Sequence, residues 1–311
     1  NNIVFQNTRY TYIDDQRWGV PSGGDWSLYR GGAIFLENTT NVSIENNLFT
    51  NLDGNVIMLS GYNRYTNLYR NTFEYIGDNV MAGWGYTDKW DGTKGLQPRF
   101  TNVIENYVHD IGLFEVQSSL WFQGKACQTN IIGNIAFNLP RAAILFNDAF
   151  GGGNNVSSNL LFNTCTETGD HGNINSWNRM PFLTNIVHGY PSFDTQYTNI
   201  YSNFIIANYD AGWGFDTDDG SAWYNTYNNF FHDSLALKND YGGFNMYYHD
   251  NINIQIDRDC SCFNFGPTNP NGIADVIYNN KCIVYDSNCN NIVDMFYPDG
   301  YIKNTVSMYN N

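Results

Sequence analysis

The chain repeats one short phrase, which in its clearest copy reads Asn130-Ile131-Ile132-Gly133-Asn134-Ile135-Ala136-Phe137. Taking the second asparagine of each copy as a marker, most intervals between markers are close to 25 residues. Intervals of 35 and 44 indicate repeats that carry an insertion, and Asn253 divides a last interval of 50. The markers are Asn46, Asn71, Asn106, Asn134, Asn159, Asn203, Asn229 and Asn279.

A near-constant period of this length indicates a repeat architecture. Each repeat holds two or three short alternating strands and leaves no room for a helix, which favours a parallel β-helix over a leucine-rich horseshoe or a helical solenoid. We therefore predict an all-β fold, a single right-handed parallel β-helix of about nine to eleven coils. The marker asparagines should stack at one turn, because asparagine tolerates left-handed backbone and its amide can bond its equivalent one coil away.

The phrase runs almost from end to end without a linker, so residues 1–311 are interpreted as one β-helix domain. Both ends fall within a strand pattern, with no initiator Met or signal peptide, and we expect the mature part or a fragment of a longer secreted chain. The net charge of −15 argues against nucleic acid and anionic membrane surfaces as partners. No apolar run approaches the ~20 residues that membrane insertion needs.

The six cysteines are expected to form disulfide bonds in an oxidising, extracellular compartment. Cys260 and Cys262 are too close along an extended strand to bridge each other easily, so their partners should lie one coil later. Six cysteines allow fifteen connectivities, and the spacing does not decide among them. The expected partners are Cys282 and Cys289, with Cys127 and Cys165 as the third pair.

Three sequons agree with secretion and mark Asn38, Asn41 and Asn155 as candidate glycosylation sites. Aromatic residues make up 17% of the chain and charged residues only 14%. This composition is typical of proteins that present flat aromatic surface to sugars, and also of a structural protein with tyrosine ladders. The predicted partner is therefore a polysaccharide or glycan.

The sharpest local signal is Asp216-Thr217-Asp218-Asp219-Gly220. Three carboxylates within four residues repel one another unless a cation, a shared proton or a basic partner relieves the repulsion. Asp216 and Asp218 are therefore a candidate Ca²⁺ site, the one cofactor considered, and Asp218 and Asp219 a candidate acid/base pair for glycosidic cleavage. The alternative is an acidic turn in water.

Three further positions extend the candidate catalytic set. Asp170 and His171 stand ahead of Arg179, where the imidazole could carry a proton and the guanidinium could hold an acidic sugar. Asp148 precedes a glycine run that would let a ligand approach the backbone. A packing histidine and a mobile glycine turn are the alternative interpretations.

Polar and aromatic segments follow each asparagine phrase at a similar phase. Equivalent strands of successive coils lie about 4.8 Å apart, so these segments should form one outward stripe. Charged and aromatic side chains in that stripe could hold a sugar chain. The candidate substrate-binding residues are Trp84, Trp121, Arg141, Trp177 and Trp213.

The segments 141–153, 163–172 and 216–220, set in the asparagine ladder, resemble the right-handed parallel β-helix, pectin-lyase-like superfamily. Polygalacturonase-type members carry an Asp-Asp pair, a Gly-His-Gly and an Arg-x-Lys. Asp218-Asp219 matches the first, Asp170-His171-Gly172 matches part of the second, and Arg179-Met180-Pro181 lacks the lysine. Pectate-lyase-type members imply Ca²⁺ held by aspartates beside an Arg or Lys base. The superfamily also includes tailspikes, adhesins and structural shafts.

Two functions follow as hypotheses. The first is a secreted polysaccharide-active enzyme, an inverting glycoside hydrolase or a lyase, that acts from an outer groove of the β-helix. The second is a non-catalytic extracellular module, structural or adhesive, such as a self-associating filament or coat protomer. Carboxylates that converge in a groove would favour the enzyme, and separated acidic turns would favour the structural module.

Overall fold

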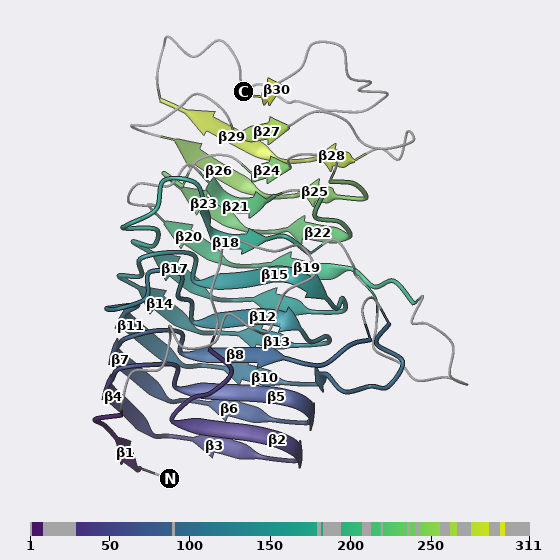
Figure 1. Ribbon diagram of the computed structural model, residues 1–311. Helices are drawn as coiled ribbons and strands as arrows, with labels where there is room; N and C mark the ends of the chain where they lie inside the picture. Colours follow the sequence, from purple (N-terminus) through teal and green to yellow (C-terminus); the bar gives the residue numbers. More distant parts are fainter. Residues whose placement is uncertain are drawn as a thin grey trace.

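The computed structural model describes residues 2–8, 29–88, 91–178, 182, 194–206, 213–218, 220–234, 237–239, 243–255, 262–265, 275–285 and 293–295. All regular structure in these residues is β-strand. The strands form three parallel sheets, and within each sheet successive strands stack along one common axis (Figure 1). Over the same residues no helix is long and apolar enough to cross a membrane.

Three sheets, which we name A, B and C, form the three sides of the solenoid. Sheet A contains β1 (Val4–Phe5), β4 (Leu48–Leu52), β7 (Thr72–Ile76), β11 (Tyr107–Ile111), β14 (Ile135–Phe137), β17 (Leu160–Phe162), β20 (Phe204–Ile206), β23 (Phe230–His232), β26 (Ile252–Gln255) and β29 (Lys281–Val284). Sheet C contains β3 (Ser43–Glu45), β6 (Asn67–Tyr69), β10 (Asn102–Ile104), β13 (Asn130–Ile132), β16 (Asn155–Ser157), β19 (Thr198–Tyr201), β22 (Tyr224–Tyr227), β25 (Tyr247–His249) and β28 (Val276–Tyr278).

Sheet B forms the third side and carries the candidate site. It contains β2 (Ile34–Thr40), β5 (Ile57–Arg64), β8 (Met81–Trp84), β9 (Pro98–Arg99), β12 (Trp121–Lys125), β15 (Ile144–Phe150), β18 (Gly172–Ser176), β21 (Trp213–Thr217), β24 (Leu237–Asn239), β27 (Phe263–Phe265) and β30 (Val293–Met295).

Each coil contributes one strand to sheet B, then one to sheet C, then one to sheet A. From β2–β3–β4 to β27–β28–β29, the described residues make nine complete coils. The predicted parallel β-helix is confirmed, and the count falls at the lower end of the nine to eleven coils expected.

The core is a continuous stack of inward-facing side chains. In sheet A, the second residues of successive strands align in register and face the core, and Phe49, Phe73 and Val108 have no exposed surface. The rings of Phe49 and Phe73 stack with centroids 4.8 Å apart. Burial of one such side chain stabilises the fold by roughly 1.5–3 kcal/mol, so each coil is held mainly by the coils on either side.

A ladder of asparagines does run along one corner, between sheets C and A. Six of the eight predicted markers belong to it, but Asn46 and Asn279 each lie one residue too early, and Asn251 takes the place of Asn253. The side chain of Asn253 instead belongs to the inward row of β26. The ladder is Asn47, Asn71, Asn106, Asn134, Asn159, Asn203, Asn229, Asn251 and Asn280.

Left-handed backbone occurs one residue before each ladder asparagine rather than at the asparagine itself. Asn46 and Asn279 have φ of 54°, and Arg70 and Glu105 have φ of 51° and 52°. The turn therefore needs the strained conformation at one position and the amide at the next. A local sequence pattern does not separate these two demands, which explains the one-residue error.

One disulfide bond lies in the described residues, between Cys262 and Cys282. It confirms the expectation that Cys262 pairs with the segment of Cys282; Cys260 and Cys289 lie outside the described residues. The predicted pairing of Cys127 with Cys165 is wrong, because the two buried thiols form no disulfide bond. The Cys165 Sγ instead donates to the carbonyl oxygen of Gly172 at 3.4 Å.

The three sequons lie in different surroundings. Asn38 lies in β2 and Asn41 directly after it; both are exposed, and their glycosylation stays a prediction. Asn155 lies in β16, where its Nδ2 donates to Asn130 Oδ1 at 2.9 Å and its Oδ1 accepts from Asn199 at 3.3 Å. A glycan on Asn155 would have to break this outer ladder.

Candidate functional site

The outer face of sheet B changes from apolar to polar along the solenoid axis. The strand register aligns one outward residue from each coil in a single row. The row is apolar in the first five coils and polar in the next four. It reads Phe35, Met58, Ala82, Phe122 and Leu145, then Asn175, Asp216, Lys238 and Asn264.

Two tryptophans predicted to bind sugar are buried in or under the apolar half. Trp84 is 4% exposed and belongs to an apolar cluster with Met58 and Phe122. Trp121 faces the core with no exposed surface, and its Nε1 donates to Gln123 Oε1 at 3.0 Å. Neither ring can receive a sugar, because strand alternation turns Trp121 inward and packing covers Trp84.

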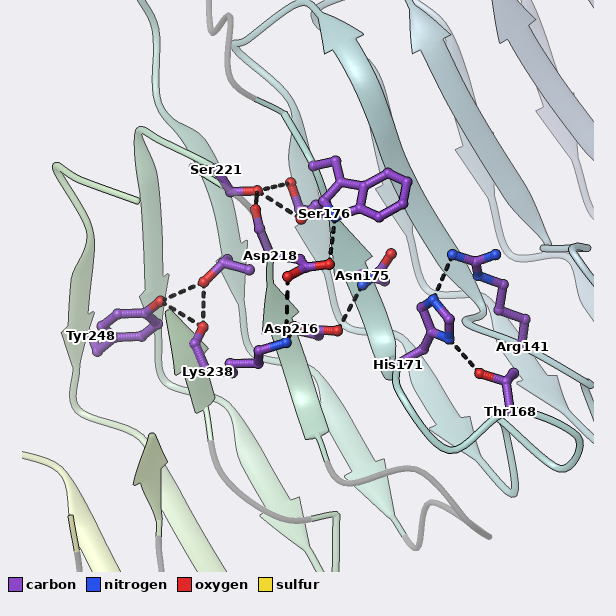
Figure 2. A network of polar contacts seen from close by, with 12 residues as sticks. Arg141, Thr168, His171, Asn175, Ser176, Asp216, Asp218, Ser221, Lys238 and Tyr248 are labelled. Atoms are coloured by element: carbon purple, nitrogen blue, oxygen red, sulfur yellow. Dashed lines mark hydrogen bonds and ion pairs between the residues drawn. The ribbon is translucent and has the colours of Figure 1, made fainter. Parts of the chain in front are cut away.

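The polar half brings two carboxylates to one ammonium group (Figure 2). Lys238 Nζ lies 3.2 Å from Asp216 Oδ1 and 3.5 Å from Asp218 Oδ1. Asn175 Nδ2 donates to Asp216 Oδ2 at 2.9 Å, and the indole nitrogen of Trp177 donates to Asp218 Oδ2. We name Asn175, Trp177, Asp216, Asp218 and Lys238 the carboxylate cluster.

The two carboxylates of the cluster lie in different environments. Asp216 has no exposed surface, and burial raises its pKa to about 7, although Lys238 opposes this shift. The negative charges of Asp218 and Asp170 also raise the pKa of Asp216. The Asp218 side chain keeps 17% of its surface exposed. One carboxyl is therefore suited to hold a proton near neutral pH, while the other meets solvent.

Lys238 supplies the basic partner that the acidic sequence required. Its ammonium group lies between the two carboxylates that were candidate Ca²⁺ ligands, so their repulsion is relieved by an ion pair. No three His, Cys, Asp or Glu side chains in the described part of the chain gather closely enough to hold a metal ion. The donor set at Asp216 and Asp218 fits Lys238 better than it fits Ca²⁺.

Two tryptophans flank the carboxylate cluster and retain exposed surface. Trp177 and Trp213 are both half-buried, and Lys238 Nζ lies 5.4 Å from the centre of the Trp213 ring. Trp177 also packs against the apolar cluster of the neighbouring coils. Of the predicted aromatic residues, these two are the ones placed beside the carboxylates.

Hydroxyl groups support the same strands from the inner side. Ser176, between Asn175 and Trp177, bonds the Tyr224 hydroxyl, and Thr217, between Asp216 and Asp218, lies 3.3 Å from the Tyr248 hydroxyl. Both tyrosines are fully buried and come from sheet C. Ser221 Oγ donates to the Asp218 carbonyl at 2.8 Å and fixes the turn after β21.

A buried Arg–His pair lies next to the cluster. Arg141 Nη2 donates to His171 Nε2 at 2.6 Å, and the Nδ1 side of the ring contacts the Thr168 hydroxyl. Burial, aided by the charges of Arg141 and Lys238, lowers the pKa of His171 to about 3. His171 is therefore neutral at neutral pH, and its role as a proton carrier stays a prediction. Arg141 has no exposed surface with which to bind substrate.

The remaining predicted residues are less fully described. Asp170 is exposed and close enough for its charge to act on Asp216. Asp148 lies in β15, but its side chain is outside the described part of the structure, as are Arg179 and Asp219 altogether.

Sequence reasoning missed Asn175 and Lys238 as site residues and treated Asp216 as a metal ligand alone. The spacing along the chain carried no signal for Lys238, because Lys238 follows Asn229 by 9 residues whereas Asp216 follows Asn203 by 13, although the two residues pair in register.

No protein-family model matches this chain, and no curated protein matches it significantly. A solved structure described as a glycoside hydrolase is similar over 82% of the chain, with a TM-score of 0.55 and 13% sequence identity. The shared feature is the parallel β-helix fold. The chain spans 39% of the length of that protein, and identity this low bears on fold alone.

Proposed function

We propose that this chain is a secreted, polysaccharide-active enzyme that works at the carboxylate cluster on the outer face of sheet B. The single observation that carries the proposal is the convergence of Asp216 and Asp218, in different environments, on Lys238. The fold shared with a glycoside hydrolase and the disulfide bond support a carbohydrate-active protein of an oxidising compartment.

The proposed chemistry is glycoside hydrolysis by two carboxyl groups. Because both lie within hydrogen-bonding or ion-pair reach of one nitrogen, their nearest oxygens are no more than about 7 Å apart, which suits hydrolysis by an acid and a base or nucleophile. Asp218, which meets solvent, contacts the sugar as the base or nucleophile. Asp216, with its raised pKa, is the proton donor, and this role requires that the substrate displace the side chains that cover it. Trp177 and Trp213 stack on sugar rings.

Lys238 and Asn175 are positioning residues in this proposal. Lys238 holds the two carboxylates at fixed distances, and Asn175 orients Asp216 from the neighbouring strand. A lyase of the pectate-lyase type would instead need an Arg or Lys base beside the sugar, and Lys238 is already engaged by Asp216 and Asp218 at 3.2 and 3.5 Å. The geometry therefore favours the hydrolase over the lyase.

A non-catalytic extracellular module is the second candidate, and one observation favours it. Asp216 has no exposed surface, as expected for a structural ion pair inside a wall of the solenoid. In that case, the cluster would stabilise sheet B, and the exposed aromatic residues would serve binding alone.

The test is a turnover screen of the purified chain on pectic, alginate-like and neutral polysaccharides, with and without Ca²⁺. New reducing ends are expected without unsaturated products, and Asp216→Asn and Asp218→Asn should each lower kcat by at least about 100-fold. Asp250→Asn, which removes an exposed carboxylate after β25 on sheet C, is the matched control and should retain most of the activity. Unsaturated products would replace the hydrolase with a lyase. Absence of turnover on every substrate would favour the structural module.

A further inference from the structure

The outer face of sheet A is apolar over six consecutive strands, from β11 to β26. Each of these strands turns two side chains outward, and the register places them in two rows. The second row contains four apolar residues and two histidines. It reads His109, Phe137, Phe162, Ile206, His232 and Ile254. The first row is Tyr107, Ile135, Leu160, Phe204, Phe230 and Ile252.

Much of this face is open to solvent. Tyr107 is 41% exposed, Ile135 36% and Phe204 43%, and the other members of the first row are half-buried. Neither row contains Asp, Glu, Lys or Arg between β11 and β26. A contiguous apolar surface of this kind on a protein with net charge −15 marks a place where another surface binds.

The aromatic rings on this face present their edges outward. Phe204 and Phe230 stack with centroids 4.5 Å apart and planes 7° apart, and Phe137 and Phe162 stack at 4.7 Å and 5°. These distances are close to the strand spacing, so the faces of the rings are turned towards their ladder neighbours along the axis. A sugar ring stacks on an aromatic face, whereas ring edges and aliphatic groups suit a flat apolar protein surface.

We propose that this face joins two copies of the chain, packed face to face with their solenoid axes antiparallel. Charged residues stand at the two ends of the face: Glu74 on β7 and Lys281 on β29. In the order of sheet A, β7 and β29 are equally distant from the midpoint between β17 and β20. A two-fold axis at that midpoint therefore places β7 of one copy opposite β29 of the other.

The end charges select this orientation over the parallel one. In the antiparallel dimer, Glu74 of each copy lies diagonally across from Lys281 of the second copy, within reach of two long side chains. In a parallel dimer, Glu74 would meet Glu74 and Lys281 would meet Lys281, and like charges that face each other destabilise an interface. The self-complementary face is what a two-fold dimer requires.

The size of the face sets how much such a dimer can bury. Eight strands at ~4.8 Å spacing extend over about 34 Å, and strands of three to five residues are about 10 to 17 Å long, which together give a projected area of about 340 to 580 Å². A stable interface buries about 800 Å² of accessible surface per partner, and a corrugated face has more accessible than projected area. Two sheets packed in this way would form an aligned sandwich.

The first test is sedimentation velocity over a concentration series. The wild-type chain should be dimeric, and Phe204→Glu should raise the dimer dissociation constant at least tenfold, because the new charge would be buried at the centre of the interface. Phe35→Glu is the matched control, since Phe35 is 46% exposed on sheet B and should not affect the dimer. Circular dichroism would show that both variants are folded.

The second test concerns orientation. Glu74→Lys and Lys281→Glu should each weaken the dimer, and the double variant should restore it, because the antiparallel pairing is then re-formed with the charges exchanged. A wild-type chain that stays monomeric overturns the proposal, whatever else this face then binds. A dimer that tolerates Phe204→Glu also overturns it, and a double variant no tighter than the single ones excludes the antiparallel arrangement. None of these readouts depends on enzymatic activity.

Discussion

Asp216 combines two features that rarely occur in a surface loop: complete burial and a single charged partner on the next strand. Removing a carboxylate from water costs several kcal/mol, and Lys238 offsets only part of that cost. The result is a carboxyl group whose pKa is raised to about 7. This property of one residue makes both the proposed acid catalysis and the stability of the fold depend on pH.

The raised pKa of Asp216 predicts how stability varies with pH. Below pH about 4, the Asp216 carboxyl is protonated in both the folded and the unfolded state. Between pH about 4 and about 7, it is protonated only in the folded state. The free energy of unfolding therefore falls as pH rises through this range, by at most about 4 kcal/mol. Asp216→Asn should lack this decline. Urea denaturation of both proteins at several pH values measures the difference, and identical slopes would contradict the pKa shift. Asp218→Asn, which leaves Asp216 buried, should retain most of the decline, reduced by the loss of the Asp218 charge that also raises the pKa of Asp216.

At the scale of single elements, the buried asparagine ladder defines the corner between sheets C and A. Asn134 Oδ1 accepts from the backbone nitrogen and the Nδ2 of Asn106, at 2.9 and 3.0 Å. Its Nδ2 donates to the Val103 carbonyl and to Asn159 Oδ1, both at 2.9 Å. Each ladder asparagine thus ties three coils together and satisfies polar groups that are closed to water.

The ladder predicts different costs for two asparagines of the same coil. Asn134→Ala should destabilise the protein by about 3 kcal/mol or more, because several buried donors and acceptors lose their partners. Asn130→Ala is the matched control. The Asn130 side chain forms hydrogen bonds of 2.9 Å with those of Asn102 and Asn155, but these lie on the partly exposed outer ladder. Its replacement should therefore cost about 1 kcal/mol or less. Urea denaturation compares the two. Equal costs would show that burial of the ladder is not what matters.

At the scale of the whole molecule, the solenoid is a stack in which each coil contacts mainly its neighbours. The coil between Asn47 and Asn71 is one such unit, 24 residues long, and the register aligns Leu48 with Thr72. Removal of one unit leaves the surfaces above and below it complementary.

Deletion of residues 48–71 should therefore yield a folded protein. Asn47 would then be followed by Thr72, and β1, β2 and β3 would pair with β7, β8 and β10. Far-ultraviolet circular dichroism should retain the β signal, with cooperative melting at a lower temperature because one coil of apolar burial is lost. Deletion of residues 48–59, half a coil, should prevent folding, since it shifts every later strand out of register. If both deletions behave alike, the coil is not the unit of folding.

The repeated phrase was enough to predict the parallel β-helix, the stacking of asparagines and the number of coils. These properties depend on residues close together in sequence, and each coil repeats the same local demands of an inward apolar residue, a left-handed turn and an amide. The sequence by itself also singled out the Asp216–Asp218 segment and the tryptophans on either side of the site.

Only the tertiary structure decided which of these residues meet. Lys238 reaches Asp216 because β24 pairs with β21 in one register, Trp121 faces inward because of strand alternation, and Cys127 and Cys165 stay apart as buried thiols. The segments between asparagine phrases vary in length from coil to coil, so the phase of a residue beyond the phrase cannot be counted along the chain. The sequence thus determined the coil, whose interactions are local, whereas the site and the apolar face arise from stacking, which no single coil encodes.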